Sequence, residues 1–247
     1  MPMIELRGVH KKFRLPDGSE FSSVAGLDFT VAPTEIVSIV GKSGCGKSTC
    51  LNLMLGLIPP SGGRIRVGGV DPFSEFDALR GRIGVVFQTD RLVPWRTALG
   101  NTEMGLEILD APKEERRERA RYWLDRVGLS GFEDAFPHQL SGGMRQRVSI
   151  ARAFTVDPEI LFCDEAFGHL DVVTGAQLRA TFLELVEETR KTCVFVTHSI
   201  VEAIEVSCRV LVFDKPARML MERPTAVDGP AATKELEEEI ILAIERA

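Results

Sequence analysis

A glycine-rich and lysine-containing stretch at residues 41–49 constrains the fold of this chain more than any other segment. It follows an apolar, β-branched run at 35–40 and leads into a helix-like stretch at 49–57. Glycines let a backbone fold tightly and aim successive N–H groups at one anion, and a helix start adds its unpaired N–H groups and positive dipole end. The order of strand, glycine loop and helix therefore predicts a phosphate-binding loop in an α/β protein.

Two side chains of this loop are suited to hold a nucleoside triphosphate. Lys47 can reach the outer phosphates, and the hydroxyl of Ser48 can ligate Mg²⁺. A chance match in a glycine-bearing turn is the alternative, and the flanking strand and helix argue against it. The residues expected to contact the nucleotide here are Gly41, Lys42, Ser43, Gly44, Cys45, Gly46, Lys47, Ser48 and Thr49.

The composition argues against several classes of protein. A formal net charge of −6 gives no support to a nucleic-acid partner, because nucleic-acid-binding domains usually carry a basic surplus. No apolar run approaches the ~20 residues of a membrane-spanning helix, and the N-terminus lacks the pattern of a signal peptide. The five cysteines have no CxxC or zinc-type spacing and favour reduced thiols. We expect a cytoplasmic chain that contacts a membrane through a partner.

The rest of the chain predicts a mixed α/β protein with a mostly helical insertion at 88–145. The apolar runs at 160–163 and 193–196 are typical of strands buried on both faces, and a helix at 172–190 between them indicates a βαβ unit and a parallel sheet. The tail at 233–246 reads as an acidic amphipathic helix. Further strands are expected at 3–31 with a turn at 15–19, at 64–67, at 83–87 and at 209–213.

Two carboxylates, Asp164 and Glu165, follow the apolar strand at 160–163. Ligands of such sheets bind at the carboxyl ends of the strands. A carboxylate at that edge can hold Mg²⁺, normally through its waters, and the next one is placed to polarise a water. The alternative is a solvated loop with two acids, which the phosphate loop upstream makes the weaker interpretation.

The segment Leu140-Ser141-Gly142-Gly143-Met144-Arg145-Gln146 is the second decisive feature. Ser141 can cap the helix that follows, and the two glycines admit close approach of another backbone. An ordinary helix N-cap is the alternative. The position of the segment 140–146 between a phosphate loop and a strand that ends in Asp-Glu favours a functional motif instead.

Together these motifs resemble the nucleotide-binding subunit of an ATP-binding-cassette (ABC) transporter, and the resemblance covers about residues 3–225. It implies a P-loop NTPase with an N-terminal antiparallel β subdomain, a mostly parallel core sheet and an α-helical subdomain. We expect residues 1–247 to form one such domain. Its expected parts are a core with the β subdomain at 1–87 and 146–225, a helical subdomain at 88–145 and a C-terminal acidic helix at 226–247.

The resemblance assigns ATP and Mg²⁺ contacts to particular residues. The loop at 41–49 matches the Walker A motif, and Phe13 matches the aromatic residue that stacks on adenine, with a core aromatic as the alternative. Asp164 matches the Walker B aspartate. Gln88, which follows the strand at 83–87, matches the glutamine that touches Mg²⁺ and senses the γ-phosphate. The implied magnesium ligands are Ser48, Gln88 and Asp164.

The resemblance also implies a catalytic set and a homodimer. Glu165 matches the general base and His198 the switch histidine, although a lone histidine is more often structural. Asp171 ends the D-loop. The signature residues Ser141, Gly142 and Gly143 contact the γ-phosphate held by the other subunit, so a monomer should bind ATP but hydrolyse it poorly. The implied catalytic residues are Glu165, His198, Gln88 and Lys47.

The segment at 88–97 resembles the "LLPW.T" sequence motif of the nitrate, sulfonate and taurine importer group. The sequence LSGGMRQR at 140–147 is also typical of that group. In the family this surface meets an integral-membrane permease. Trp95 is a candidate contact anchor because aromatic residues are enriched at interface cores; packing inside the helical insertion is the alternative. A solute-binding protein outside the membrane is an indirect partner.

These features predict the ATPase subunit of an importer for a small anion or organic solute, a translocase on the inner face of the membrane. The alternatives are an ABC ATPase of another membrane system, such as lipid or small-organic transport, and a non-catalytic regulatory cassette. Two residues depart from the group. Ala166 replaces the common proline, and His169 stands where a small residue is usual, so His169 could alter dimer closure, with neutral variation as the alternative.

Overall fold

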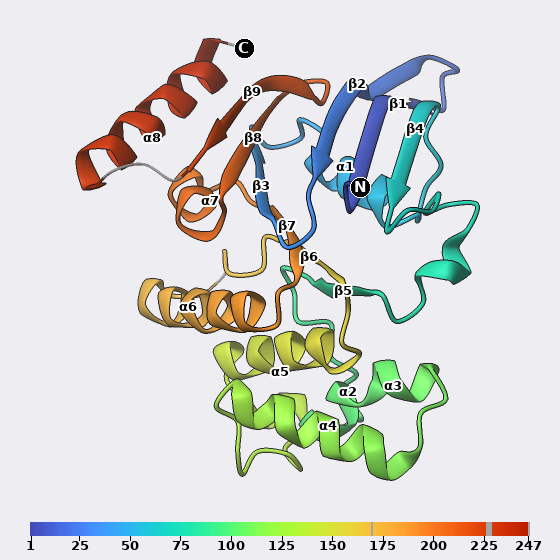
Figure 1. Ribbon diagram of the computed structural model, residues 1–247, viewed down its shortest axis with the longest axis vertical. Coiled ribbons are helices and arrows are strands. Elements are labelled where there is room, and N and C mark those ends of the chain that lie inside the picture. The colour runs from blue at the N-terminus through green and yellow to red at the C-terminus, as the bar shows by residue number, and fades with distance from the viewer. Residues whose placement is uncertain (169, 226–228, 247) are drawn as a thin grey trace. The chain divides into compact units, whose positions relative to one another are not determined.

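The computed structural model describes residues 1–168, 170–225 and 229–246 (Figure 1). The chain divides into two compact units. The first consists of Met1–Leu79 and Thr192–Ala247, and the second of Arg80–Lys191. No helix in the described ranges is long and apolar enough to cross a membrane.

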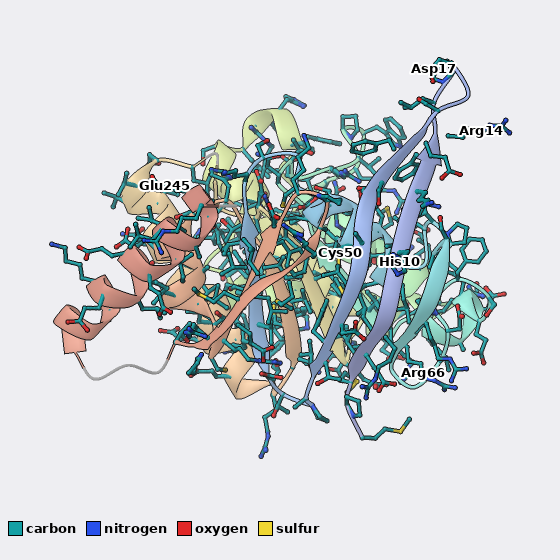
Figure 2. The ribbon with its side chains drawn as sticks, turned by 90° about the horizontal axis from the view of Figure 1, so that it is seen from above. His10, Arg14, Asp17, Cys50, Arg66 and Glu245 are labelled. Atoms are coloured by element: carbon teal, nitrogen blue, oxygen red, sulfur yellow. The ribbon has the colours of Figure 1, made fainter. Side chains whose placement is uncertain are left out.

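A three-stranded antiparallel sheet opens the first unit. Its order is β2-β1-β4, formed by β1 (Ile4–Arg14), β2 (Glu20–Val31) and β4 (Gly62–Val67). The expected turn at 15–19 is confirmed, with the Leu15 N–H donating to Ser19 O at 2.8 Å. Figure 2 shows Asp17 at the tip of this β1–β2 hairpin. Alternate residues of β1, such as Ile4 and Leu6, are fully buried, as a sheet with one covered face requires.

The second sheet of the first unit carries the glycine loop. Its strands follow the order β7-β3-β8-β9, formed by β3 (Ile36–Gly41), β7 (Thr192–Val196), β8 (Arg209–Asp214) and β9 (Arg218–Pro224). β3 is parallel to both of its neighbours, and all its residues are buried. Helices α1 (Lys47–Met54) and α7 (Ile200–Val206) pack against it. The first unit also contains a 3₁₀ turn, η1 (Phe76–Leu79).

Helix α8 (Gly229–Arg246) lies along the same unit, beside α7 and β9 (Figure 1). Leu236 and Ile240 pack into a buried cluster with Val40, Ala203 and Val212. Glutamates fill much of its opposite face, which confirms the amphipathic acidic helix expected at 233–246.

The second unit combines two strands with a helical body. β5 (Ile83–Val86) pairs in parallel with β6 (Ile160–Asp164). Helix α5 (Gly142–Thr155) packs against its helical neighbours and β5, and rings from α4, α5 and α6 form an aromatic core with centroids 5.0 and 5.9 Å apart. The other elements are α2 (Ala98–Thr102), α3 (Met104–Ile108), α4 (Lys113–Arg126), η2 (Pro137–Gln139) and α6 (Val172–Glu188).

One predicted helix is shifted along the chain. The helix expected at 49–57 runs instead from Lys47 to Met54, so Lys47 and Ser48 belong to its first turn. Gly56 adopts a φ of 70°, which turns the backbone out of the helix.

Candidate functional site

The glycine loop of the first unit is pressed against strands of its own unit. It runs from Gly41, at the end of β3, to Gly46, which precedes α1 with a φ of 118°. A Cβ atom on Gly46 would lie 2.4 Å from Ser23 O, and one on Gly41 would lie 2.4 Å from Phe213 O. Because neither position has room for a side chain, the loop is held in one tight path at the amino end of α1.

Lys47 is the buried cation of this loop. Lys47 is only 7% exposed, and its Nζ donates to Gly41 O at 2.8 Å and Lys42 O at 3.2 Å. Among the described residues, no carboxylate forms an ion pair with this ammonium. A buried ammonium beside the N–H groups of a helix start is an arrangement suited to anionic phosphate. Ser48 is exposed one residue later, in the same turn.

Cys45, within the loop, and Cys50, just after it, are both buried. Cys45 is 1% exposed and Cys50 is fully buried in the interior (Figure 2). Burial, and secondarily the neighbouring Cys45, raises the pKa of the Cys50 thiol to about 12. The five cysteines all lie in the described ranges, and they form no disulfide with one another.

Phe13 and His198 are the other expected site residues of the first unit. Phe13 on β1 is 37% exposed, with Lys11 Nζ 5.0 Å from its ring centroid, so the alternative of a core aromatic is wrong. His198 is exposed and follows β7, the parallel neighbour of β3. The carboxyl ends of these strands meet at one edge, which brings His198 to the edge where the glycine loop begins.

The turn around His198 is fixed on both sides. The hydroxyl of Thr197 donates to a carboxylate oxygen of Glu202 and accepts from the Ser199 N–H at 3.1 Å. Ser199 caps α7 by accepting from the Glu202 N–H at 3.2 Å. The local sequence therefore holds the histidine on a rigid turn rather than on a loose loop.

In the second unit, Gln88 and the two carboxylates follow neighbouring parallel strands. Gln88 comes after β5 and is exposed, while Asp164 ends β6 and Glu165 follows it, both half-buried. Val86 pairs with Cys163, so the three side chains start from the same edge of the strand pair. Glu165 has a φ of 47°, in the left-handed region that non-glycine residues rarely adopt.

The segment at 141–143 starts α5 and lies near the start of α6. Ser141 accepts from the Met144 N–H at 3.3 Å, which confirms the predicted cap. Asp171 caps α6 by accepting from the Thr174 N–H at 3.0 Å, and this hydrogen bond lowers the pKa of Asp171. A Cβ atom on Gly143 would lie 2.8 Å from Thr174 Cγ2. Gly143 at the start of α5 therefore lies against Thr174 in the first turn of α6, the turn that Asp171 caps.

Of the two residues that depart from the importer group, the structure describes Ala166 but not His169. Ala166 is fully buried directly after Glu165. His169 lies outside the described residues.

The residues expected to hold Mg²⁺, which are Ser48, Gln88 and Asp164, offer one hydroxyl, one amide and one carboxylate. Among the described residues there is no group of three or more His, Cys, Asp or Glu side chains that could hold a metal ion. Mg²⁺ at phosphate sites usually takes one or two protein ligands and completes its shell with phosphate oxygens and waters. The donor set of Ser48, Gln88 and Asp164 therefore fits a nucleotide-bound Mg²⁺ and not a dedicated protein cage.

Sequence reasoning missed Asn101, which organises the loop that carries Trp95. Asn101 is fully buried; Nδ2 donates to the carbonyls of Val93, Arg96 and Thr97 at 3.0–3.1 Å, and Oδ1 accepts from the Val93 N–H at 2.7 Å. Trp95 is 78% exposed on this loop, so its expected alternative, packing inside the helical insertion, is wrong.

A family model and curated relatives match this chain. Residues 24–168 match the family model described as ABC transporter. The chain is 44% identical over 197 residues to a taurine import ATP-binding protein, TauB, of Yersinia pestis, a match that covers 80% of this chain and 76% of that protein.

Two solved structures share the fold. The ATP-binding cassette MJ0796, in a dimeric post-hydrolysis state bound to ADP and Pi, matches with a TM-score of 0.81 and 33% identity over 92% of this chain and all of that one. Clostridium perfringens cbiO1, part of the ABC transporter complex cbiONQ, matches with a TM-score of 0.82 and 26% identity over 99% of this chain and 96% of that one.

Proposed function

The chain belongs to the ABC transporter family, and we propose that it is the ATP-hydrolysing subunit of an importer for a small anion or organic solute of the nitrate, sulfonate or taurine type. The observation that carries the ATPase part is the buried ammonium of Lys47 on a glycine loop at a helix start. The importer part is supported by similarity to the taurine import protein and by the segment at 88–97.

In this proposal the catalytic machinery consists of the glycine loop and of side chains that follow β5, β6 and β7. Lys47 neutralises charge on the outer phosphates, and the loop N–H groups orient them. Ser48, Gln88 and Asp164 would hold a nucleotide-bound Mg²⁺, which would supply further charge neutralisation. Glu165 accepts a proton from the attacking water, and His198 stabilises the γ-phosphate. Phosphoryl transfer depends on such positioning and charge more than on covalent chemistry, which suits this residue set.

We further propose that the active form is a homodimer in which residues 141–143 and Asp171 of one subunit complete the ATP site of the other. Ser141 is exposed at the start of α5, where a partner can reach it. The similarity to a dimeric cassette bound to ADP and Pi supports the same assembly. ATP then stabilises the closed dimer, and hydrolysis releases it.

Replacing Lys47 by alanine should weaken ATP binding about tenfold to a hundredfold, because charge-assisted hydrogen bonds contribute about 1.5–3 kcal/mol. Fluorescence titration with a nucleotide analogue measures the change. Lys234→Ala is the matched control, since that lysine is 76% exposed in its side chain and pairs with Glu238 within α8. Equal affinity in the two variants would contradict the assignment of the loop.

Replacing Trp95 by alanine should reduce solute uptake in cells severalfold and leave the basal ATPase of the purified subunit unchanged. Trp95 is 78% exposed on a loop that Asn101 holds rigid, and exposed aromatics on rigid loops are common contact anchors. Uptake of taurine, an alkanesulfonate and nitrate is measured in a deletion strain that expresses each variant. Phe132→Ala, an exposed aromatic of the same unit, is the control. Normal uptake by the Trp95 variant would argue against a permease contact here.

A further inference from the structure

Gln146 is a buried amide at the end of the segment 140–146, and no role has been assigned to it above. It lies on the inner face of α5 and is fully buried. Its Nε2 donates to two backbone carbonyls of the same unit, Phe87 O at 3.0 Å and Ala166 O at 2.7 Å. Both protons of the amide are therefore in use, and each bond ends on a peptide next to an expected site residue.

The two carbonyls also fix the orientation of the amide. Among the described residues, Oε1 of Gln146 has no hydrogen-bond partner. A buried acceptor without a partner is unfavourable, and an apolar residue of similar length would avoid it. A flipped amide would place Oε1 against two carbonyl oxygens, so the NH₂ group must face them. The Gln146 side chain therefore serves to donate two hydrogen bonds.

The first carbonyl belongs to the residue before Gln88, and the second to the residue after Glu165. Glu165 has a φ of 47°, and a non-glycine residue keeps such a conformation only where its surroundings hold it. Ala166 is fully buried, and its carbonyl is tied to α5. The bond from Gln146 therefore restrains the backbone that sets the direction of the Glu165 side chain.

The same helix also holds the loop that follows Gln88. Arg145 Nε donates to Asp90 Oδ2 at 2.9 Å, and Arg152 donates to Asp90 O at 2.7 Å and Arg91 O at 2.9 Å. Among these side chains of α5, Gln146 is bonded both to the residue after β5 and to the segment after β6. It links the end of β5, the end of β6 and the helix that begins at Ser141.

We propose that Gln146 is a positioning residue for ATP hydrolysis: its amide fixes Glu165 and Gln88 relative to one another and to α5. This inference rests on the roles proposed above for Glu165 and Gln88. Misplacement of a catalytic group by about 1 Å can lower a rate about a hundredfold without loss of binding. The effect should therefore appear in kcat and not in the affinity for ATP.

The test replaces Gln146 by methionine, which keeps the length of the side chain and removes both donors. We expect kcat to fall about tenfold to a hundredfold, with the KM for ATP within twofold of the parent value. Thr155→Val on the same helix is the control, because Thr155 is also fully buried and donates to Ala151 O at 2.6 Å. If the methionine variant does not fold, Gln146→Asn, whose amide is too short for both carbonyls, carries the same expectation.

A double variant separates positioning from general damage. In a Glu165→Gln background, Gln146→Met should cause a smaller fold loss in single-turnover hydrolysis of radiolabelled ATP than in the parent background, because part of its effect passes through Glu165. An equal fold loss in both backgrounds overturns the inference. Normal kcat in Gln146→Met beside an inactive Glu165→Gln overturns the role of Gln146 alone, whereas full turnover in Glu165→Gln overturns the proposed role of Glu165 itself.

Discussion

Replacing Glu165 by glutamine is expected to lower ATP turnover about 10²–10⁴-fold while ATP affinity stays unchanged. Glutamine has nearly the same shape as glutamate, but its amide cannot accept the proton of the attacking water. Glu165 is half-buried directly after β6, beside Asp164, at the edge where Gln88 also starts. The groups proposed to hold the phosphates, above all Lys47, are untouched, so the nucleotide should still bind.

Because the proposed dimer closes on ATP and opens on hydrolysis, this variant should also accumulate as an ATP-bound dimer. Size-exclusion chromatography with and without ATP measures that accumulation, and phosphate release measures turnover. Glu159→Gln is the control at the other end of the same strand. Glu159 forms an ion pair with Arg82 at 2.7 Å, away from the carboxyl edge, and its loss should leave turnover near the parent value. Parent-like turnover in Glu165→Gln would remove Glu165 as the base.

The main elements of the fold could be predicted because the sequence pattern and the local geometry agree. The buried run of β3 and the turn at 15–19 lie where apolar and turn residues predict them. The start of α1 could not be placed, because Lys47 and Ser48 read as loop residues. The close contact of Gly46 with Ser23 O, from a strand distant in sequence, sets the backbone from which the helix begins.

The expected site residues were recognisable because their chemistry is tied to motifs at strand and helix ends. Gln146 and Asn101 were not assigned a role, since a single amide in a helix has no local pattern. The partners of Gln146 are backbone atoms far along the chain, whereas those of Asn101 lie just before its own helix. One signal was present in retrospect. Gln146 is a polar residue on the face of α5 that carries Ile150 and Ala153, both buried, and a polar group on a buried face must find partners.

Replacing Ser141 by arginine is expected to abolish measurable hydrolysis while the affinity of the monomer for ATP stays within about threefold. In the proposed dimer the bulky cation meets the ATP of the other subunit, whereas the nucleotide loop of its own chain is unchanged. Loss of the helix cap costs about 1 kcal/mol, which a folded domain of this size tolerates. Thermal unfolding with and without ATP checks the stability of the fold and the affinity for ATP. A matching loss of affinity and hydrolysis would contradict a role in the partner's site.

A mixing experiment decides whether Ser141 acts on its own chain or on its partner. Subunits with Ser141→Arg keep an intact Lys47, and subunits with Lys47→Ala keep an intact Ser141. In a mixed dimer, the loop of the first and the signature residues of the second form one complete site. Random equimolar mixing makes half of the dimers mixed, each with one of two sites complete, so about a quarter of the parent activity should return. If Ser141 completed the site of its own chain, no mixed dimer would contain a complete site and mixing would restore nothing.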